Sequence, residues 1–429
     1  MGFNIGYLCK RMKLGKMLFD IGISGAGHTG LSAAIALAKK GFSVLLIDPQ
    51  DRANGGQTEL DQSTHIQRTT ACLNQATAFL KSIDVWDFLE PKACPLQHLR
   101  IINQQKIGSI NLGTSQTIFS AEEIGESQFG FNVPLAESLL ALKRTAEQEP
   151  LIDLKLGLSL FKLKQFNEYA ELHLSNGQKF CTKLVIGADG GQSSVRHLAS
   201  IPFVTKNTGQ TVLSFNIVHQ KPHKNISTEI YSEGGPFTLV PLKSTDGKNS
   251  SAVVWMQKKF DAQSLLRLTP ARFLKVVDHA TRGILGEVNS CSVIGKKEIT
   301  IKVAGQVKNG RAILLGEAAH LLPPIGAQGF NLSVQEICNL TKLAVAYRDR
   351  LGSEEMVQDY QAQVLPESLI RSSGVGLLNL VAFSSNPASQ IGREIGLTLL
   401  RQSPALRRFA MHFGLFNATK LQPFKQRNS

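Results

Sequence analysis

FDIGISGAGHTGLSAAIALAKKGFSVLLIDP, residues 19–49, is the stretch that decides the fold. Residues 19–24 are apolar enough for a short strand, and residues 31–39 are rich in Ala and Leu with apolar side chains at helical spacing. Gly41 follows as a cap for that helix, and residues 42–47 are a second apolar run. The pattern therefore predicts a strand, a helix and a second strand in one unit.

Three glycines and one acid stand at the ends of these predicted elements. Gly25, Gly27 and Gly30 have the spacing of a loop that needs a tight turn, close backbone approach to a pyrophosphate and close packing of helix on strand. The free N–H groups of the helix start would then face the phosphates. Asp48, 18 residues after Gly30, suits hydrogen bonds from a ribose diol. The unit predicts dinucleotide binding and leaves NAD and FAD open.

Two further polar residues accompany this loop. His28 stands within it and is interpreted as a variable position of the pattern, not as a catalyst. Arg68 either reaches the pyrophosphate or lies on the surface as an ordinary arginine, and the sequence favours neither reading.

Two later stretches repeat the order of an apolar strand followed by glycine and acid. Residues 154–174 alternate leucines with other residues, an Asn-Gly pair at 176–177 signals a hairpin turn, and the predicted meander ends in KLVIGADGGQSSVRHLA. The third stretch is GRAILLGEAAHLLPPIGAQGFNL. It predicts a strand at 312–315 and a helix at 332–347, whose first N–H groups suit an electron-rich ring edge.

The three stretches together resemble a known family. GAGHTG, GADGGQSSVR and GEAAHLLPPIGAQGFNL, in this order, resemble the three FAD motifs of the class A flavoprotein aromatic hydroxylases, the group typified by para-hydroxybenzoate hydroxylase. The resemblance is greatest to the ubiquinone-biosynthesis hydroxylases and runs from about residue 18 into the C-terminal tail. Two positions depart from the family pattern: Glu317 replaces the usual Asp, and Ser-Val-Gln-Glu at 333–336 replaces Gly-Leu-Arg-Asp.

The resemblance implies an α/β fold in which a Rossmann-like FAD-binding domain carries an inserted β-sheet substrate domain and a C-terminal helical tail. The expected boundaries are 18–90, 130–200 and 300–365 for the FAD-binding domain, 91–129 and 201–299 for the β-rich domain, 366–429 for the tail, and 1–17 as an extension. The β-rich residues 200–300, with 98–112, should form a sheet over the flavin. Residues 234–241 are expected to contact substrate, whereas Phe237 and Trp255 are interpreted as core.

The resemblance also implies which residues hold the cofactor. The residues expected to contact FAD are Gly25, Ala26, Gly27, Gly30, Asp48, Arg68, Asp189, Gly190, Gly316, Glu317, Gly326, Gln328, Gly329, Phe330 and Asn331. The flavin itself would be the catalytic group, with Pro324, Gly326 and Gly329 in the loop beside its ring. No general base is identified, because His320 suits a structural role as well as a catalytic one.

The activity implied by the resemblance is hydroxylation of the aromatic ring of a polyprenylated phenol in ubiquinone biosynthesis, with NAD(P)H and molecular oxygen as co-substrates. The expected location is cytoplasmic, peripheral on the inner face of the bacterial inner membrane, in contact with a ubiquinone-biosynthesis complex. Three alternatives stay open: a flavin hydroxylase of soluble aromatics, an isoprenoid-lipid reductase, and an FAD-binding assembly subunit without turnover.

The charge of the chain is concentrated at its C-terminal end. The 429 residues carry a net charge of +14, and the eight Lys and Arg against one acid in residues 371–429 supply half of it. Ile391, Ile395 and Leu399, then Leu406, Phe409 and Phe413, recur at helical spacing. They predict a basic amphipathic helix that either contacts anionic lipid, through Arg393, Arg401, Arg407 and Arg408, or packs on the protein body. No base-stacking motif supports nucleic-acid binding.

The remaining composition describes an ordinary globular chain. It is 42% hydrophobic and 19% charged, and no apolar run reaches the ~18 residues of a membrane span. The six cysteines are scattered without metal-ligand spacing, so we expect thiols of a reducing compartment and no metal site.

Overall fold

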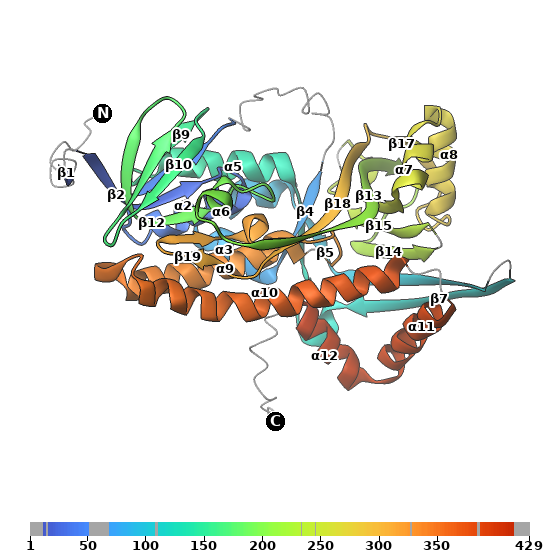
Figure 1. Ribbon diagram of the computed structural model, residues 1–429. Helices are drawn as coiled ribbons and strands as arrows, with labels where there is room; N and C mark the ends of the chain where they lie inside the picture. The colour runs from blue at the N-terminus through green and yellow to red at the C-terminus, as the bar shows by residue number, and fades with distance from the viewer. Residues whose placement is uncertain are drawn as a thin grey trace, which may run out of the picture.

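The computed structural model describes residues 12–13, 16–50, 68–107, 110–232, 234–244, 246–326, 328–383 and 387–415. Cys9, most of the predicted extension 1–17 and the basic residues beyond 415 lie outside these ranges, as does the side chain of Phe413. The described part holds two nine-stranded sheets and one three-stranded sheet. Figure 1 places the two large sheets side by side, with the long helix α10 (Glu354–Phe383) running beneath both and the last two helices beneath the second sheet. The predicted mixed α/β class is confirmed.

The first large sheet is built around parallel strands that are buried on both faces. β2 (Lys16–Ser24) lies between β12 (Lys179–Gly187) and β3 (Val44–Asp48), and α2 (His28–Ala38) connects β2 to β3. Strands covered on both faces must be apolar throughout, as residues 44–47 are. The strands of this sheet are β1 (Met12–Lys13), β2 (Lys16–Ser24), β3 (Val44–Asp48), β9 (Ile152–Leu156), β10 (Leu160–Gln165), β11 (Ala170–Leu174), β12 (Lys179–Gly187), β19 (Lys308–Asn309) and β20 (Ala312–Leu314).

The predicted meander is only partly correct. β10, β11 and β12 are consecutive antiparallel neighbours, and the Asn-Gly turn at 176–177 joins the last two. β9 does not belong to them. It pairs in parallel with β3 at the opposite edge of the sheet. Alternation of side chains predicts a strand but not its partner, because the pairing is decided by distant parts of the chain.

The second large sheet separates a hydrophobic core from the site. On one face, α7 (Lys259–Leu266) and α8 (Pro270–Ala280) pack against the core that contains Phe237 and Trp255, as predicted for both aromatic residues. Their rings meet edge to face, with centroids 5.1 Å apart. The strands, in order across the sheet, are β21 (His320–Leu321), β18 (Gly295–Ala304), β13 (Phe203–His219), β16 (Asn249–Lys258), β15 (Gly235–Pro241), β14 (Ile226–Ser232), β6 (His98–Ile107) and β7 (Ile110–Ser120), and β17 (Val288–Cys291) also pairs with β13.

The remaining elements connect and cover these sheets. A small sheet is formed by β4 (Thr69–Leu73), β8 (Gly130–Pro134) and β5 (Cys94–Leu96). The helices beside the first sheet are α3 (Asn74–Ser82), α4 (Trp86–Leu89), α5 (Leu135–Gln148), α6 (Ser194–Leu198) and α9 (Gln328–Ala346). The C-terminal helices are α10 (Glu354–Phe383), α11 (Pro387–Gln402) and α12 (Pro404–Leu415). Short 3-10 turns cover Glu90–Lys92, Ala121–Ile124, Gly316–Ala318 and Arg348–Arg350.

Candidate active site

The three glycine-rich stretches meet at one edge of the first sheet. Gly187 at the end of β12 is in register with Ser24 of β2 on one side and with Leu314 of β20 on the other. Backbone hydrogen bonds continue this contact beyond the strands, from Ala188 N to Ser24 O at 2.8 Å and from Leu315 N to Gly187 O at 2.9 Å. Carboxyl ends of parallel strands are where open α/β sheets bind nucleotides.

The glycines of the first loop differ in what fills the space beside them. Protein atoms occupy that space at two of the glycines, and it is open to a ligand at the third. A Cβ on Gly25, whose φ is +107°, would lie 2.4 Å from Ala188 O, and a Cβ on Gly30 would lie 1.7 Å from Gly25 O. A Cβ on Gly27 would meet no atom within 4 Å. Gly27 caps α2, whose first turn has neither an acidic residue nor a side-chain cap. The N–H groups of that turn therefore face open space suited to a phosphate.

Asp48 shapes this loop from the end of β3. Its side chain is buried, Oδ2 accepts the Ala26 N–H at 2.7 Å, and Oδ1 accepts the Gln50 N–H at 2.7 Å. The carboxylate thus ties the glycine loop to the next strand, a role that the sequence pattern did not reveal. Its predicted contact with a ribose stays a prediction.

The hydrogen bonds around Asp189 indicate most clearly that a ligand fits at this edge of the sheet. Its Oδ2 accepts the N–H groups of Ser194 at 2.7 Å and Val195 at 3.2 Å. Its Oδ1 is buried and has no hydrogen-bond partner in the described residues. A buried carboxylate oxygen without a donor is costly, so this atom is suited to a ligand hydroxyl. Gly190, with φ +78°, leaves open space beside it.

The third motif is fixed by a buried ion pair. Glu336 Oε2 accepts the Gly316 N–H at 2.8 Å, and Glu336 Oε1 lies 2.6 Å from His320 Nε2. Both side chains are only 2% exposed. Burial lowers the pKa of His320, but the charge and the hydrogen bond of Glu336 outweigh it, so the pKa lies above its ordinary value. His320 therefore has a structural partner, and the acid kept at position 336 was the sequence signal for it.

The loop after this pair opens into a cavity of about 540 Å³. Glu317, Pro324, Gly326, Gly329 and Phe330 all line it. The helix that follows begins at Gln328, four residues before the predicted start, so Gly329 and Phe330 stand in the first turn of α9. Their N–H groups have no partner within a regular helix and can face a ring.

Asn331 was predicted to contact the flavin ring, and the structure gives its amide another role. Asn331 Oδ1 accepts the Leu73 N–H at 2.9 Å, and Nδ2 donates to Ala71 O at 2.8 Å. The side chain thus bonds β4 to the first turn of α9. Because Thr69 and Leu73 line the cavity, this bracket fixes part of its wall.

The two polar residues near the first loop have separate places. His28 Nε2 lies 3.2 Å from Leu135 O, and its ring meets that of Phe330 edge to face at 6.0 Å. Arg68 is exposed and lines a smaller cavity of about 190 Å³ together with Glu317 and Pro324. Arg68 therefore lies close to the third motif, and its contact with a pyrophosphate stays a prediction.

The other walls of the large cavity come from the second sheet and the C-terminal helices. Strands β6, β14, β15 and β16 contribute apolar and polar side chains in equal number, and α10 and α12 close the far end with Leu378, Ala410 and Met411. Residues 238 and 240, within the stretch predicted to contact substrate, face this cavity. Glu229 and Asn132 also line it, and neither was singled out in the sequence.

Comparison with known proteins agrees with this geometry. The family model described as an FAD binding domain matches residues 19–368. The chain belongs to the FAD-binding domain family. This match covers all three motifs, and it makes FAD the cofactor for which the edge of the first sheet is built. Gly27 and Asp189 are the residues whose surroundings fit the bound group most directly.

Relatives of this FAD-binding protein cover almost the whole chain. The ubiquinone hydroxylase UbiL of Rhodospirillum rubrum is 25% identical over 94% of this chain and 91% of its own. The 3-demethoxyubiquinol 3-hydroxylase of Escherichia coli is 26% identical over 92% of this chain and 98% of its own. Among solved structures, p-nitrophenol 4-monooxygenase PnpA from Pseudomonas putida shares the fold, with a TM-score of 0.72, 14% identity and coverage of 94% of this chain and 99% of that one.

Bound FAD would supply the redox chemistry, and the chain supplies its surroundings. The start of α2 and Asp189 would hold the nucleotide half, while the first turn of α9 would direct N–H groups at the ring. The Glu336–His320 pair fixes the loop between them, because it joins Gly316 to α9. Ile101, Val240 and Val254 of the second sheet would limit water in the part of the cavity that they line.

Proposed function

We propose that the protein is an FAD-dependent monooxygenase that hydroxylates the aromatic ring of a polyprenylated phenol in ubiquinone biosynthesis, with NAD(P)H as reductant and molecular oxygen as oxidant. The names of the relatives support this reaction. One structural observation carries the choice of substrate. The cavity runs from the third FAD motif to the C-terminal helices and is mostly apolar along that length.

The two ends of the cavity suit the two halves of such a substrate. At one end, Gly326, Gly329 and Phe330 provide the place for a flat ring beside the flavin. At the other end, Leu378, Ala410 and Met411 provide an apolar passage between α10 and α12. An isoprenoid chain that extends from the ring along this passage would stabilise the complex by roughly 25 cal/mol per Å² of apolar surface buried.

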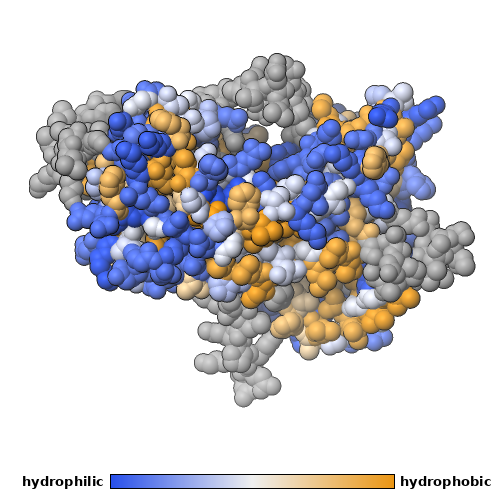
Figure 2. Space-filling model, viewed as in Figure 1, coloured by the Kyte–Doolittle hydropathy of each residue, from blue (hydrophilic) through white to orange (hydrophobic). Residues whose placement is uncertain are grey.

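The outer surface beside this passage is unusually apolar. Leu377 is 63% exposed, Leu380 60%, Ile395 56% and Phe409 48%. Figure 2 shows an orange patch over the region where Figure 1 draws α11 and α12. No helix in the described residues is long and apolar enough to cross a membrane. These residues support peripheral contact with a bilayer, from which a polyprenylated phenol would enter the passage.

For the arginines of the tail, the sequence left lipid contact and packing on the protein body open, and their contacts favour packing. Arg407 forms a two-point ion pair with Glu123, with Nη2 and Oε1 2.6 Å apart, and Arg401 Nη2 lies 2.6 Å from Glu394 Oε1. Arg393 donates to Asn103 and to the carbonyl of Val381. Arg393 and Arg407 thus fasten α11 and α12 to the protein body, whereas the ion pair of Arg401 lies within α11 and its contact with the body is a weak one, from Nη1 to Thr117 Oγ1 at 3.5 Å. The apolar residues, not the charges, support the membrane proposal.

The proposed location is therefore peripheral, on the inner face of the bacterial inner membrane, within reach of other ubiquinone-biosynthesis proteins. The domain boundaries given above are part of the same proposal, with the first sheet as the FAD-binding domain and the second sheet as the substrate domain. Residue 366, the predicted start of the tail, lies within α10.

Oxygen uptake by the purified protein tests the function. We expect NAD(P)H-dependent uptake on adding a prenylated phenol, with a hydroxylated product found by mass spectrometry. A ring without the prenyl chain should react more weakly, because it leaves the apolar passage empty. Equal turnover of both rings would favour a hydroxylase of soluble aromatics. NAD(P)H oxidation that saturates a prenyl double bond without oxygen would favour a reductase, and absence of turnover would favour an assembly subunit.

A further inference from the structure

Glu229 lies in the middle of the sheet face that forms the cavity wall. It belongs to β14, where it pairs with Ile101 of β6 on one side and with Thr238 of β15 on the other. Thr238 pairs in turn with Val254 of β16. All four residues line the cavity, so their side chains form one row across its wall. Among the described residues, Glu229 is the only acid of the second sheet in this wall.

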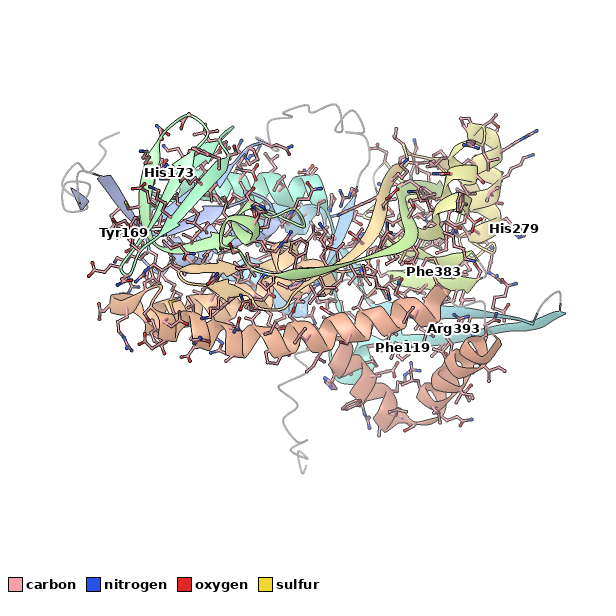
Figure 3. All side chains as sticks on the ribbon, in the orientation of Figure 1. Phe119, Tyr169, His173, His279, Phe383 and Arg393 are labelled. Atoms are coloured by element: carbon pink, nitrogen blue, oxygen red, sulfur yellow. The ribbon has the colours of Figure 1, made fainter. Side chains whose placement is uncertain are left out.

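One oxygen of the Glu229 carboxyl accepts a hydrogen bond from the protein, and the other can accept one from a ligand. Tyr231 Oη donates a hydrogen bond to Glu229 Oε2 at 2.7 Å. Oε1 has no hydrogen-bond partner in the described part of the chain, although the side chain is not closed off, since it faces the cavity. Behind Tyr231, the guanidinium of Arg393 lies 5.3 Å from the ring centroid. Figure 3 labels Arg393 where α11 meets the strands of the second sheet.

The surroundings of Glu229 change its acidity in the direction that a base needs. Burial raises the pKa of the carboxyl above its ordinary value of 4.5, and the hydrogen bond from Tyr231 opposes that rise. Of the other titratable groups around the cavity, His98 lies on β6, and Glu317 and His320 lie in the third motif. Arg393 acts on Glu229 only through Tyr231. A carboxylate whose pKa is raised is a stronger base toward a phenol proton than an ordinary carboxylate.

We propose that Glu229 accepts the hydrogen bond of the substrate's ring hydroxyl and takes its proton during hydroxylation, with Tyr231 as the positioning residue behind it. The inference rests on the proposed function, which supplies the phenol and the oxidant. The three other titratable groups that line the cavity are less suited. His320 is paired with Glu336, and Glu317 is an exposed side chain of the FAD motif itself. His98 is the first residue of β6, three positions before the Ile101 that pairs with Glu229, and so stands outside the row across the middle of the wall.

The proton transfer applies to hydroxylation at a ring carbon ortho or para to the existing ring hydroxyl. As the ring carbon bonds to one oxygen atom of the O₂-derived oxidant, the O–O bond breaks and the second oxygen atom keeps its electron pair. At the same time the phenolic O–H bond breaks, its proton passes to Glu229 Oε1, and its electron pair becomes the second bond of a ring carbonyl. The hydrogen on the newly hydroxylated carbon then leaves as a proton, which the second oxygen atom of the oxidant takes up. The ring regains aromaticity, the carbonyl oxygen recovers a proton from Glu229, and the carboxylate is restored.

Glu229→Gln in the FAD-loaded enzyme is the test, because it keeps the volume and an acceptor oxygen but cannot take a proton. We expect kcat for a prenylated phenol to fall about 10²–10⁴-fold, the usual contribution of general acid–base catalysis, with KM little changed. In the wild type, kcat should fall as pH drops below the raised pKa of Glu229, and this acidic limb should be absent in the variant. Glu287→Gln, an exposed carboxylate outside the cavity, is the matched control.

A second substrate separates proton transfer from a structural role. Methylating the ring hydroxyl should slow the wild type by a similar factor but should not slow Glu229→Gln further, whereas Glu229→Asp should recover part of the rate on the phenol. FAD content and Kd for the phenol, measured through the flavin absorbance, should stay close to the wild type. A Glu229→Gln enzyme with full kcat, or one whose loss is the same on phenol and methyl ether, would overturn the inference. An inactive wild type would instead overturn the proposed function.

Discussion

At the scale of single residues, the FAD site contains positions that the fold requires and positions that only a ligand requires. Gly25 and Gly30 have no room for a side chain, because backbone carbonyls occupy it. Gly27 has room for a side chain. Asp189 Oδ1 has no hydrogen-bond donor among the described residues. The sequence pattern predicted all of these positions. It could not predict that Asp48 binds the loop backbone or that Asn331 brackets β4, because those contacts join residues far apart in the chain.

Gly27→Asp should therefore remove FAD without unfolding the protein. Gly27 has the extended backbone of a helix N-cap, where Asp is favoured, so the carboxylate would cap α2 in the place of a phosphate and repel it. We expect a colourless protein with an unchanged or slightly raised unfolding temperature, measured by absorbance and circular dichroism. Gly30→Ala should lose the fold together with FAD. Full flavin occupancy in Gly27→Asp would show that the phosphates bind elsewhere.

The Glu336–His320 pair gives the molecule a pH-dependent term in its stability. The pKa of His320 is higher in the folded state than in the unfolded state. The pair therefore adds its full contribution to the free energy of unfolding below pH 6.5, and this contribution is lost as pH rises through the pKa of the folded state. Glu336→Gln should lower the free energy of unfolding by about 3–5 kcal/mol at acidic pH and by less at alkaline pH.

The difference between the free energies of unfolding of wild type and variant, measured at each pH, isolates the contribution of this pair. His219 and His223, whose pKa values burial lowers, change the free energy of unfolding with pH in the opposite direction. They are present in both proteins, so their effect cancels in the difference. Glu298→Gln, which breaks an exposed pair with Lys259, is the control and should leave the free energy of unfolding close to that of the wild type. A difference that does not change between pH 6 and pH 9 would contradict a charged pair.

At the scale of elements, strand and helix types were predictable, and their partners and first residues were not. α9 begins at Gln328 although glycine and asparagine in its first turn disfavour a helix. The bracket from Asn331 to β4 and the hydrogen bond from Ser333 Oγ to Gly329 O hold that turn. Tertiary contacts thus override local propensity, which no local pattern reveals.

Gly329→Val tests whether the first turn of α9 governs flavin reactivity. A Cβ at Gly329 would meet no protein atom within 4 Å, so the fold should tolerate the change. We expect FAD to stay bound while kcat falls about 10²-fold, because a displaced N–H donor no longer stabilises charge on the ring. Gly374→Val, at an equally open glycine within α10, should leave kcat unchanged. Wild-type turnover in Gly329→Val would exclude this role.

The C-terminal helices should bind membranes through their apolar face. Replacing Leu399, Leu406 and Phe409 by Ser should abolish sedimentation with lipid vesicles, whether the vesicles are anionic or neutral. Arg407→Ser should instead lower the unfolding temperature, because it breaks the ion pair with Glu123 that holds α12. Phe260→Ser, at a side chain 80% exposed on the second sheet's helices, is the control. Binding that survives the triple change but is lost in high salt would restore the electrostatic explanation.

At the scale of the whole molecule, the arrangement of the sheets follows from the motifs, and the substrate passage does not. Three strand–glycine–acid stretches imply one parallel sheet edge, and the structure places them there. The passage depends on α10, which continues through residue 366 and contacts both β19 and β15. A helix of 30 residues joining two sheets could not be predicted from a segment that looked like the start of a tail.

Labelled molecular oxygen tests the central claim most directly. The purified FAD-loaded protein would be incubated with a prenylated phenol, NAD(P)H and ¹⁸O₂, and the product examined by mass spectrometry. The account predicts a ring-hydroxylated product that carries one ¹⁸O atom, and loss of that product in Gly27→Asp. A product without the label, a product altered only in its prenyl chain, or equal yield from Gly27→Asp would contradict it.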